Sequence, residues 1–128
     1  MQLQLQRRGD SLLIHSCIPA PADGGRCRIR IADDWYEQSL ILTPQAVALW
    51  EVEHADSLTE AHFQRLAELD AEVVILGLGR HAAVVHAALA RPLMRRRIGL
   101  ETMDTAAACR TYNILASDGR RAAAALIA

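Results

Sequence analysis

The chain has 128 residues, the usual size of one domain, and is long enough to bury roughly two-thirds of its unfolded surface. Its net charge of −1 argues against bulk electrostatic binding of nucleic acid, and no apolar run approaches the roughly 20 residues that a transmembrane helix needs. We therefore expect a single domain over residues 1–128, with no nucleic-acid partner and no membrane span.

Two further features bear on the cellular compartment. The N-terminal sequence MQLQLQRRGD lacks the charged-then-apolar order of a signal peptide, which predicts a cytoplasmic protein. The three cysteines, Cys17, Cys27 and Cys109, form no Cys-x-x-Cys pair. Free thiols in a reducing compartment are therefore expected rather than a disulfide framework.

The first half of the chain predicts strands. QLQLQ and RCRIRI alternate with period two, as strands with one buried face do, and LLIHSCI and QSLILT are short apolar runs of strand length. The four predicted strands cover residues 2–6, 12–18, 26–31 and 38–43. Between the second and the third, APADGG predicts a turn, because Gly24 and Gly25 tolerate a positive φ.

The second half predicts helices alternating with strands. Ser57 and Glu60 have capping-box spacing, and the apolar residues that follow predict an amphipathic helix over residues 59–69. EVVILG is a nearly all-apolar run, which is typical of a central strand covered on both faces. The next segment, RHAAVVHAALA, predicts a helix that Pro92 interrupts.

The C-terminal part continues this alternation. IGLETM predicts a strand over residues 98–103, and a helix then follows that ends at Gly119, a natural C′ residue. We interpret the tail, RRAAAALIA, as a further strand. The β-α-β-α-β order over residues 72–128 predicts parallel crossover connections and an α/β sheet.

A possible phosphate-binding turn follows the EVVILG strand. Gly77, Gly79 and Ala82 have G-x-G-x-x-A spacing, and Glu101 or Asp104 lies about 20 residues further on, as in dinucleotide-binding folds. A complete dinucleotide site needs two βαβ halves, however, and barely one is available. We therefore interpret the motif as a tight turn that needs small residues, and we expect no cofactor.

A better candidate is the stretch LETMDTAAACRTYN, which concentrates functional groups. Asp104 or Thr105 would be the N-cap of a helix at the carboxyl end of a strand, where open α/β sheets gather ligands. Cys109 and Arg110 lean back toward that end, and Arg110 and Asn113 share one helix face. This arrangement makes a cradle for a carboxylate or phosphate geometrically possible, and a thiol there could have a lowered pKa.

The alternative is that the same residues only build a well-capped helix. Asp104 would itself occupy the amide groups that an anion needs, and Arg110 could pair with Asp104 or Glu101. Cys109 lies among alanines, where a cysteine is usually a small buried hydrophobe. We prefer the capped helix, then the ligand cradle, then an active site. The five histidines show no metal-ligand spacing, so no metal site is expected.

Several segments together resemble a known family. SLILTP, Trp50, EVVILGLG and the string from IGLETM to the end are similar to the Mth-type family of uncharacterised domains. Its members include bacterial proteins, an adipogenesis-associated Mth-domain protein and an NDUFAF-type mitochondrial assembly factor of respiratory complex I. The resemblance implies a three-layer α/β domain around a central mixed sheet, with a β-rich N-terminal half and a C-terminal βαβαβ half. It implies no established enzyme activity.

The resemblance is most specific over residues 98–121, where M-D-T-x-A-A-C-R-T-Y-N and a following G-R recur in order. The family signature falls on Gly77, Gly79, Met103, Asp104, Thr105, Cys109, Arg110, Thr111, Tyr112, Asn113, Gly119 and Arg120. Leu78 departs from it, because relatives commonly have threonine there, and the missing hydroxyl weakens a phosphate-loop interpretation.

Three functions stay open at this point. The leading one is a non-catalytic protein-binding or assembly-factor-type module with another protein as its partner. The second is a binder of a small anionic ligand near Asp104 and Arg110, and the third is a thiol-dependent enzyme or redox sensor using Cys109. The candidate ligand or partner site comprises Gly77, Gly79, Asp104, Thr105, Cys109, Arg110 and Asn113.

Overall fold

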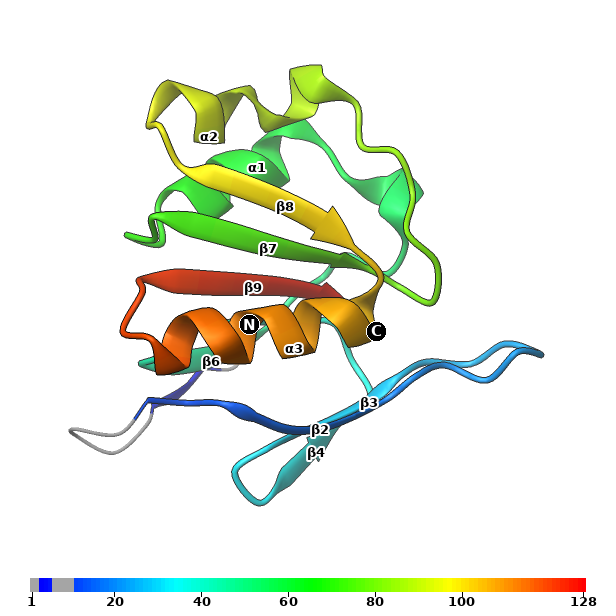
Figure 1. Ribbon diagram of the computed structural model, residues 1–128. Helices are drawn as coiled ribbons and strands as arrows, with labels where there is room; N and C mark the ends of the chain where they lie inside the picture. The colour runs from blue at the N-terminus through cyan, green and yellow to red at the C-terminus, as the bar shows by residue number, and fades with distance from the viewer. Residues whose placement is uncertain (1–2, 6–10) are drawn as a thin grey trace.

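A computed structural model describes residues 3–5 and 11–128 and shows three layers around a six-stranded sheet (Figure 1). In spatial order the strands of this sheet are β1 (Leu3–Leu5), β6 (Ala46–Leu49), β5 (Leu40–Leu42), β9 (Ala122–Ile127), β7 (Val73–Leu78) and β8 (Gly99–Met103). A smaller sheet contains β2 (Ile14–Ile18), β3 (Arg28–Ile31) and β4 (Asp34–Tyr36). The helices are α1 (Glu60–Ala67), α2 (Arg91–Arg95) and α3 (Thr105–Ser117), with short 3-10 turns η1 (Ala55–Ser57) and η2 (Ala87–Ala90).

The large sheet is mixed, as expected. β7 runs parallel to both β8 and β9, whereas β9–β5, β5–β6 and β6–β1 are antiparallel pairs. The order β7-α2-β8-α3-β9 is the predicted βαβαβ half, and the strands β1 to β6 make the preceding half β-rich. The predicted α/β class and the three-layer architecture are confirmed.

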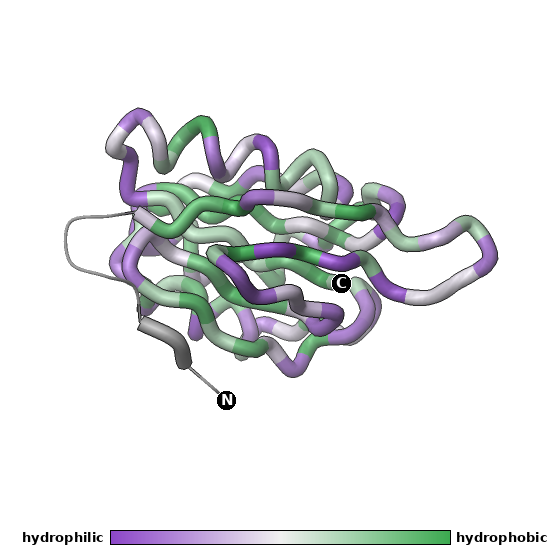
Figure 2. Tube along the Cα trace, turned by 90° about the horizontal axis from the view of Figure 1, so that it is seen from below, coloured by the Kyte–Doolittle hydropathy of each residue, from purple (hydrophilic) through white to green (hydrophobic). Residues whose placement is uncertain are grey.

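The two faces of the large sheet carry separate cores. Along β9, Ala122, Ala124 and Leu126 pack toward α3 and the small sheet, while the alternate residues pack toward α1 and α2. This alternation follows from the period of two in a strand. Because most β9 side chains are alanine, helices can approach the sheet closely on both sides. Figure 2 shows the hydrophobic stretches along the strands and hydrophilic residues at many outer turns.

Several predicted boundaries are confirmed in the second half of the chain. All six residues of β7 are buried, and it lies between β8 and β9, as its apolar composition indicated. The alanine-rich tail forms strand β9. Helix α3 ends before Gly119, which has a φ of +80° and therefore a C′ conformation that glycine adopts easily.

The helix predicted from RHAAVVHAALA is wrong. Residues 80–86 are not helical, η2 follows them, and α2 begins at Arg91 with Pro92 in its first turn. Proline is favourable there because the first helical N–H groups need no partner within the helix and the ring presets φ. Pro92 thus starts a helix that it was expected to break.

In the first half of the chain, the sequence did not predict strands β4 and β6 or the correct N-cap of α1. The turn before β6 depends on Thr43, whose Oγ1 accepts the Ala46 N–H at 3.1 Å, so the chain reverses directly after Pro44. The β3–β4 turn places Ala32 at a φ of 53° without the glycine or asparagine that usually marks such turns. The N-cap of α1 is Thr59 and not Ser57. Residues 2 and 6 of the predicted first strand lie outside the described residues.

Candidate functional site

The predicted site lies where β8 passes into α3. Asp104 is the N-cap of α3, and its Oδ1 accepts the Ala107 N–H at 2.9 Å. The buried Thr105 hydroxyl donates to the Ile127 carbonyl at 2.6 Å and accepts the Gly79 N–H at 2.8 Å. The polar groups of both side chains therefore bind neighbouring backbone.

Both glycines of the G-x-G-x-x-A motif serve this junction. A Cβ at Gly77 would lie 2.9 Å from the Cα of Thr105, so only glycine lets α3 approach β7 this closely. Gly79 has a φ of +94°, and its carbonyl accepts the Thr105 N–H at 2.8 Å. The motif has the geometry of a tight turn that carries α3.

The middle of α3 holds the small sheet in place. Asn113 Oδ1 accepts the Ile14 N–H at 2.8 Å, and its Nδ2 donates to the Ile14 carbonyl at 2.7 Å, so the side-chain amide pairs like a neighbouring strand. The Tyr112 hydroxyl donates to the Leu12 carbonyl at 2.8 Å. Burial also raises the pKa of Tyr112. These two side chains connect residues about a hundred positions apart, a role that their spacing within the helix did not indicate.

The two remaining predicted site residues differ in burial: Cys109 is buried and Arg110 is exposed. Cys109 is only 3% exposed and packs between α3 and the small sheet. The nearby Cys17 thiol, together with burial, raises the pKa of Cys109, which opposes its use as a nucleophile. Arg110 is exposed, and no ion pair to Asp104 or Glu101 occurs in the part of the chain that the structure describes.

A cavity of about 210 Å³ lies over the α3 N-terminus. Its lining comprises Pro19, Ala20, Cys27, Gly79, Arg80, Asp104, Thr105 and Ala106. Three of the seven predicted site residues border it, but Asp104 adds a negative charge and already occupies an amide that an anion would need. These contacts favour an architectural role; the ligand cradle stays a prediction.

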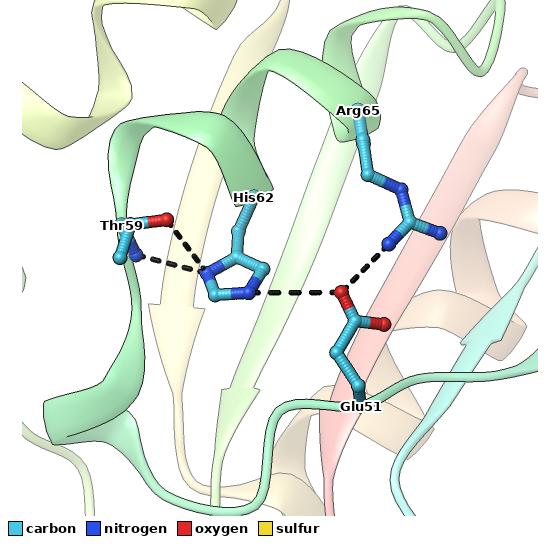
Figure 3. Close-up of polar contacts among 4 residues, drawn as sticks. All are labelled: Glu51, Thr59, His62 and Arg65. Atoms are coloured by element: carbon cyan, nitrogen blue, oxygen red, sulfur yellow. Dashed lines mark hydrogen bonds and ion pairs between the residues drawn. The ribbon is translucent and has the colours of Figure 1, made fainter.

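A polar cluster that the sequence did not reveal links the segment after β6 to α1 through side-chain contacts (Figure 3). His62 Nδ1 accepts the Thr59 N–H at 2.9 Å, which places the imidazole proton on Nε2, 3.7 Å from Glu51 Oε1. The same carboxylate oxygen accepts from Arg65 at 2.7 Å. Since the imidazole lone pair binds the backbone, His62 caps the helix and is not available as a general base. The i,i+3 spacings of Thr59 with His62 and of His62 with Arg65 were the sequence signals for the cluster.

The connection from β7 to β8 contrasts with this internal pairing. Residues 73–100 contain five arginines and no acidic residue. Arg91, Met94 and Arg95 are exposed at helical spacing on α2, opposite the buried Leu93. We call these three residues the arginine face. Neither of its arginines makes an ion pair within residues 3–5 and 11–128.

The described residues contain neither a metal-binding cluster nor a membrane-spanning helix. Within the described residues, no group of three or more histidine, cysteine or acidic side chains is arranged to hold a metal ion. The same part of the chain contains no helix that is long and apolar enough to cross a membrane.

Comparison with known proteins places this geometry in a family. Residues 23–127 match the family described as "Protein of unknown function (DUF498/DUF598)". The chain belongs to this family. The DUF498/DUF598 match includes the whole α3 junction. The resemblance to Mth-type domains is confirmed as well, because one solved relative is described as a Mth938-like domain.

Solved structures of bacterial relatives share the fold over nearly the whole chain. A crystal structure of a Bordetella parapertussis protein is 32% identical, with a TM-score of 0.80, and the match covers 94% of this chain and 98% of that one. A Bordetella pertussis protein described as a Mth938-like domain is 26% identical, with a TM-score of 0.76 and coverage of 99% and 92%.

Curated relatives carry a functional name. A Danio rerio protein named NADH dehydrogenase [ubiquinone] 1 alpha subcomplex assembly factor 3 is 41% identical over 86 residues. The match covers 66% of this DUF498/DUF598 chain and 49% of the zebrafish protein. The chain thus spans about half of the length of the curated relatives that it matches.

Proposed function

We propose that this DUF498/DUF598 chain is a non-catalytic, protein-binding module of the assembly-factor type. The similarity to assembly factor 3 at 41% identity carries the proposal. The site geometry supports it, because the polar side chains that first suggested chemistry bind backbone instead: Asp104 and Thr105 at the α3 junction, and Asn113 on β2. His62, the histidine of the Glu51 cluster, likewise has its lone pair occupied.

We place the partner's docking surface on the arginine face. Met94 is 64% exposed, and Arg91 and Arg95 flank it with no carboxylate among the described ion pairs. Arginine and methionine are enriched in protein interfaces, where arginine makes planar contacts with carboxylates and methionine adapts to irregular apolar surfaces. The matching partner surface combines acidic and apolar side chains.

The experiment combines capture with a defined binary complex. The tagged chain is purified from cells that express it naturally, the retained proteins are identified, and binding to each purified candidate is measured directly. The Arg91→Glu/Arg95→Glu double variant is compared with Arg110→Glu, which reverses an exposed arginine on the opposite face of the sheet.

We expect one purified partner to bind the wild-type chain with micromolar or tighter affinity. The double variant should weaken that binding on the order of tenfold or more, and Arg110→Glu should leave it unchanged, because charge reversal acts at the contact. A chain that retains no specific protein refutes the assembly-type function. Loss with Arg110→Glu alone would move the docking surface to the α3 side, where the predicted site lies.

A cytoplasmic location is part of this proposal. Immunodetection of the full-length protein in fractionated source cells tests it, and recovery in a membrane or organelle fraction would contradict it.

A further inference from the structure

The large sheet has an open edge at β8. This strand is the last in the order β1-β6-β5-β9-β7-β8, and it pairs with β7 alone (Figure 1). Three of its five residues are exposed. Its register with β7 is regular from Gly99 to Met103, and it contains no proline. β8 therefore lacks the bulge and the proline that commonly protect an edge strand.

The backbone of β8 shows which groups face this edge. The Gly99 N–H donates to the Glu72 carbonyl of the β7 side at 3.0 Å, so the peptide groups of Gly99 face β7. Because these groups alternate in direction along a strand, Glu101 and Met103 also face β7, whereas Leu100 and Thr102 face outward. Within residues 3–5 and 11–128, the N–H groups and carbonyls of Leu100 and Thr102 bind no backbone outside the sheet.

The outer strand of the small sheet is treated differently. β2 lies at one end of the order β2-β3-β4, and the Asn113 side chain binds both the N–H and the carbonyl of Ile14 at 2.8 and 2.7 Å. The domain thus covers this part of the β2 edge with its own side-chain amide. No described side chain does the same for Leu100 or Thr102, so their backbone groups can pair with another chain.

The two ends of the β8 edge carry opposite charge. Arg95 and Arg97 are exposed just before the strand, and neither forms an ion pair in the described part of the chain. Glu101 is exposed on the strand, and Asp104 follows its last residue. An antiparallel neighbour is therefore favoured if its C-terminal end is acidic and its N-terminal end is basic.

A second copy of this chain does not match the edge. Two copies of β8 could use all the outward groups only in the two-fold register that sets Leu100 opposite Thr102 of the other copy. That register also places the two Glu101 side chains directly opposite each other, where like charges are destabilising. The occupant that fits is a segment of a different protein.

We propose that β8 binds an extended segment of a protein partner, which adds to the large sheet as an antiparallel strand with a basic N-terminal and an acidic C-terminal end. This inference rests on the proposed protein-binding function and names how the partner is held. Hydrogen bonds to Leu100 and Thr102 supply the main-chain contact, and the charged ends fix the direction. Leu100 packs on the α1–α2 side of the sheet, so alternate side chains of the segment lie on the side that carries the arginine face.

The first test uses the free chain. Hydrogen exchange is followed by NMR, and the oligomeric state is measured by sedimentation over a range of concentrations. We expect a monomer in which the Leu100 and Thr102 amides exchange on the order of tenfold or more faster than those of Glu101 and Met103, because only the latter pair with β7. Slow exchange at Leu100 and Thr102, in the monomer or in a dimer of this chain, overturns the proposal.

The second test adds a defined strand. Three capped heptapeptides are titrated to millimolar concentration: KTVTVEE, the reversed sequence EEVTVTK, and KTVPVEE, in which proline removes a central donor. We expect KTVTVEE to shift the Leu100 and Thr102 amide signals and slow their exchange, and the other two peptides to bind on the order of tenfold more weakly. No shift with KTVTVEE overturns strand addition, and equal or tighter binding of EEVTVTK overturns the antiparallel direction.

A pair of variants connects the edge to the natural partner. Thr102→Pro removes one outward N–H and spares the ladder to β7, whereas Thr102→Ala is the matched control that keeps this N–H. Thr102→Pro should weaken binding of KTVTVEE and of the captured partner on the order of tenfold, and Thr102→Ala should not. The wild-type peptide results decide the matter even if Thr102→Pro fails to fold.

The outcomes also separate this inference from the function on which it rests. A partner that binds without slowing exchange at Leu100 and Thr102, and that binds both variants equally, refutes strand addition and leaves the protein-binding function intact. If the chain retains no protein, the protein-binding function fails, and with it the claim that a partner occupies this edge, whatever the peptides do.

Discussion

The two connections between the parallel strands differ sharply in how they use their polar residues. The β8–β9 connection contains α3, and its Asp104, Thr105 and Asn113 side chains all bind backbone within the domain. The β7–β8 connection has only short helical segments, and exposes Val84 at 99% and the arginine face to solvent. A dense set of functional groups in sequence can thus be structural, whereas an apparently plain alanine- and arginine-rich segment offers the free surface.

The largest expected effect comes from adding a methyl group at Gly77, where α3 packs most closely on β7. Gly77→Ala places a methyl group 2.9 Å from the Thr105 Cα and Oγ1, and should lower the free energy of unfolding by about 2–3 kcal/mol through overpacking. Urea unfolding measures this change. Gly99→Ala is the control on β8, where the nearest atom lies at 3.6 Å and a change below about 1 kcal/mol is expected. Equal losses in both variants would contradict the close-approach argument.

The next effect concerns the attachment of the small sheet. Asn113→Ala leaves the Ile14 N–H and carbonyl without the side-chain amide, and should cost about 2 kcal/mol because partly buried polar groups lose their partners. Hydrogen exchange should show faster exchange at Ile14, and thermal unfolding should show the stability loss. Ile114→Ala, at the adjacent exposed position, should change stability by less than about 0.5 kcal/mol. An unchanged Ile14 exchange rate in Asn113→Ala would refute the attachment.

A smaller difference should appear at the helix start. Asp104→Ala removes the cap on the Ala107 N–H and should lower the free energy of unfolding by about 1 kcal/mol. By contrast, Arg91→Glu/Arg95→Glu on the other connection should change it by less than about 0.5 kcal/mol, because neither guanidinium has a carboxylate partner among the described ion pairs. A double variant less stable than Asp104→Ala would give the arginine face a structural role.

The smallest expected effect concerns the ion pair between Glu51 and Arg65. The backbone N–H of Glu51, then Arg65, holds the pKa of the Glu51 carboxyl below its ordinary value of 4.5. A lowered folded pKa contributes stability that is present above the unfolded pKa and is lost as pH falls through the folded value. Because the Glu51 side chain is 55% exposed, solvent screening limits the contribution to about 0.5 kcal/mol or less.

Unfolding of wild type and Glu51→Gln at pH 7 and pH 3 measures this contribution. The variant should be slightly less stable at pH 7, and the difference should narrow at pH 3. A difference that grows toward low pH would reverse the sign and refute the assignment.

The parts of the fold with strong local signals were predictable from the sequence. The apolar run that forms β7 and the glycine that ends α3 can each be recognised from a few neighbouring residues. The β3–β4 turn was not predictable, because Ala32 takes a positive φ at a position where glycine or asparagine is usual. The helix expected from alanine-rich residues 80–90 failed because alanine favours a helix but does not supply the buried face that stabilises one.

The site was predictable only in part, for a related reason. An N-cap at this junction follows from local chemistry, and of the two candidates that the sequence offered, Asp104 and Thr105, the structure selects Asp104. The backbone groups that Tyr112 and Asn113 bind, at Leu12 and Ile14, lie about a hundred positions earlier in the chain, so no spacing rule could connect them. Which side chains stay free for function depends on such distant contacts.

The position of β9 has a consequence for biosynthesis. β9 follows every other element in the chain, yet it lies between β5 and β7 and pairs with both. On the ribosome, the antiparallel half and the parallel half therefore have no common seam until residues 122–127 emerge, and two apolar strands wait with open edges. Until β9 pairs with both strands, these open apolar edges make the nascent polypeptide prone to aggregation.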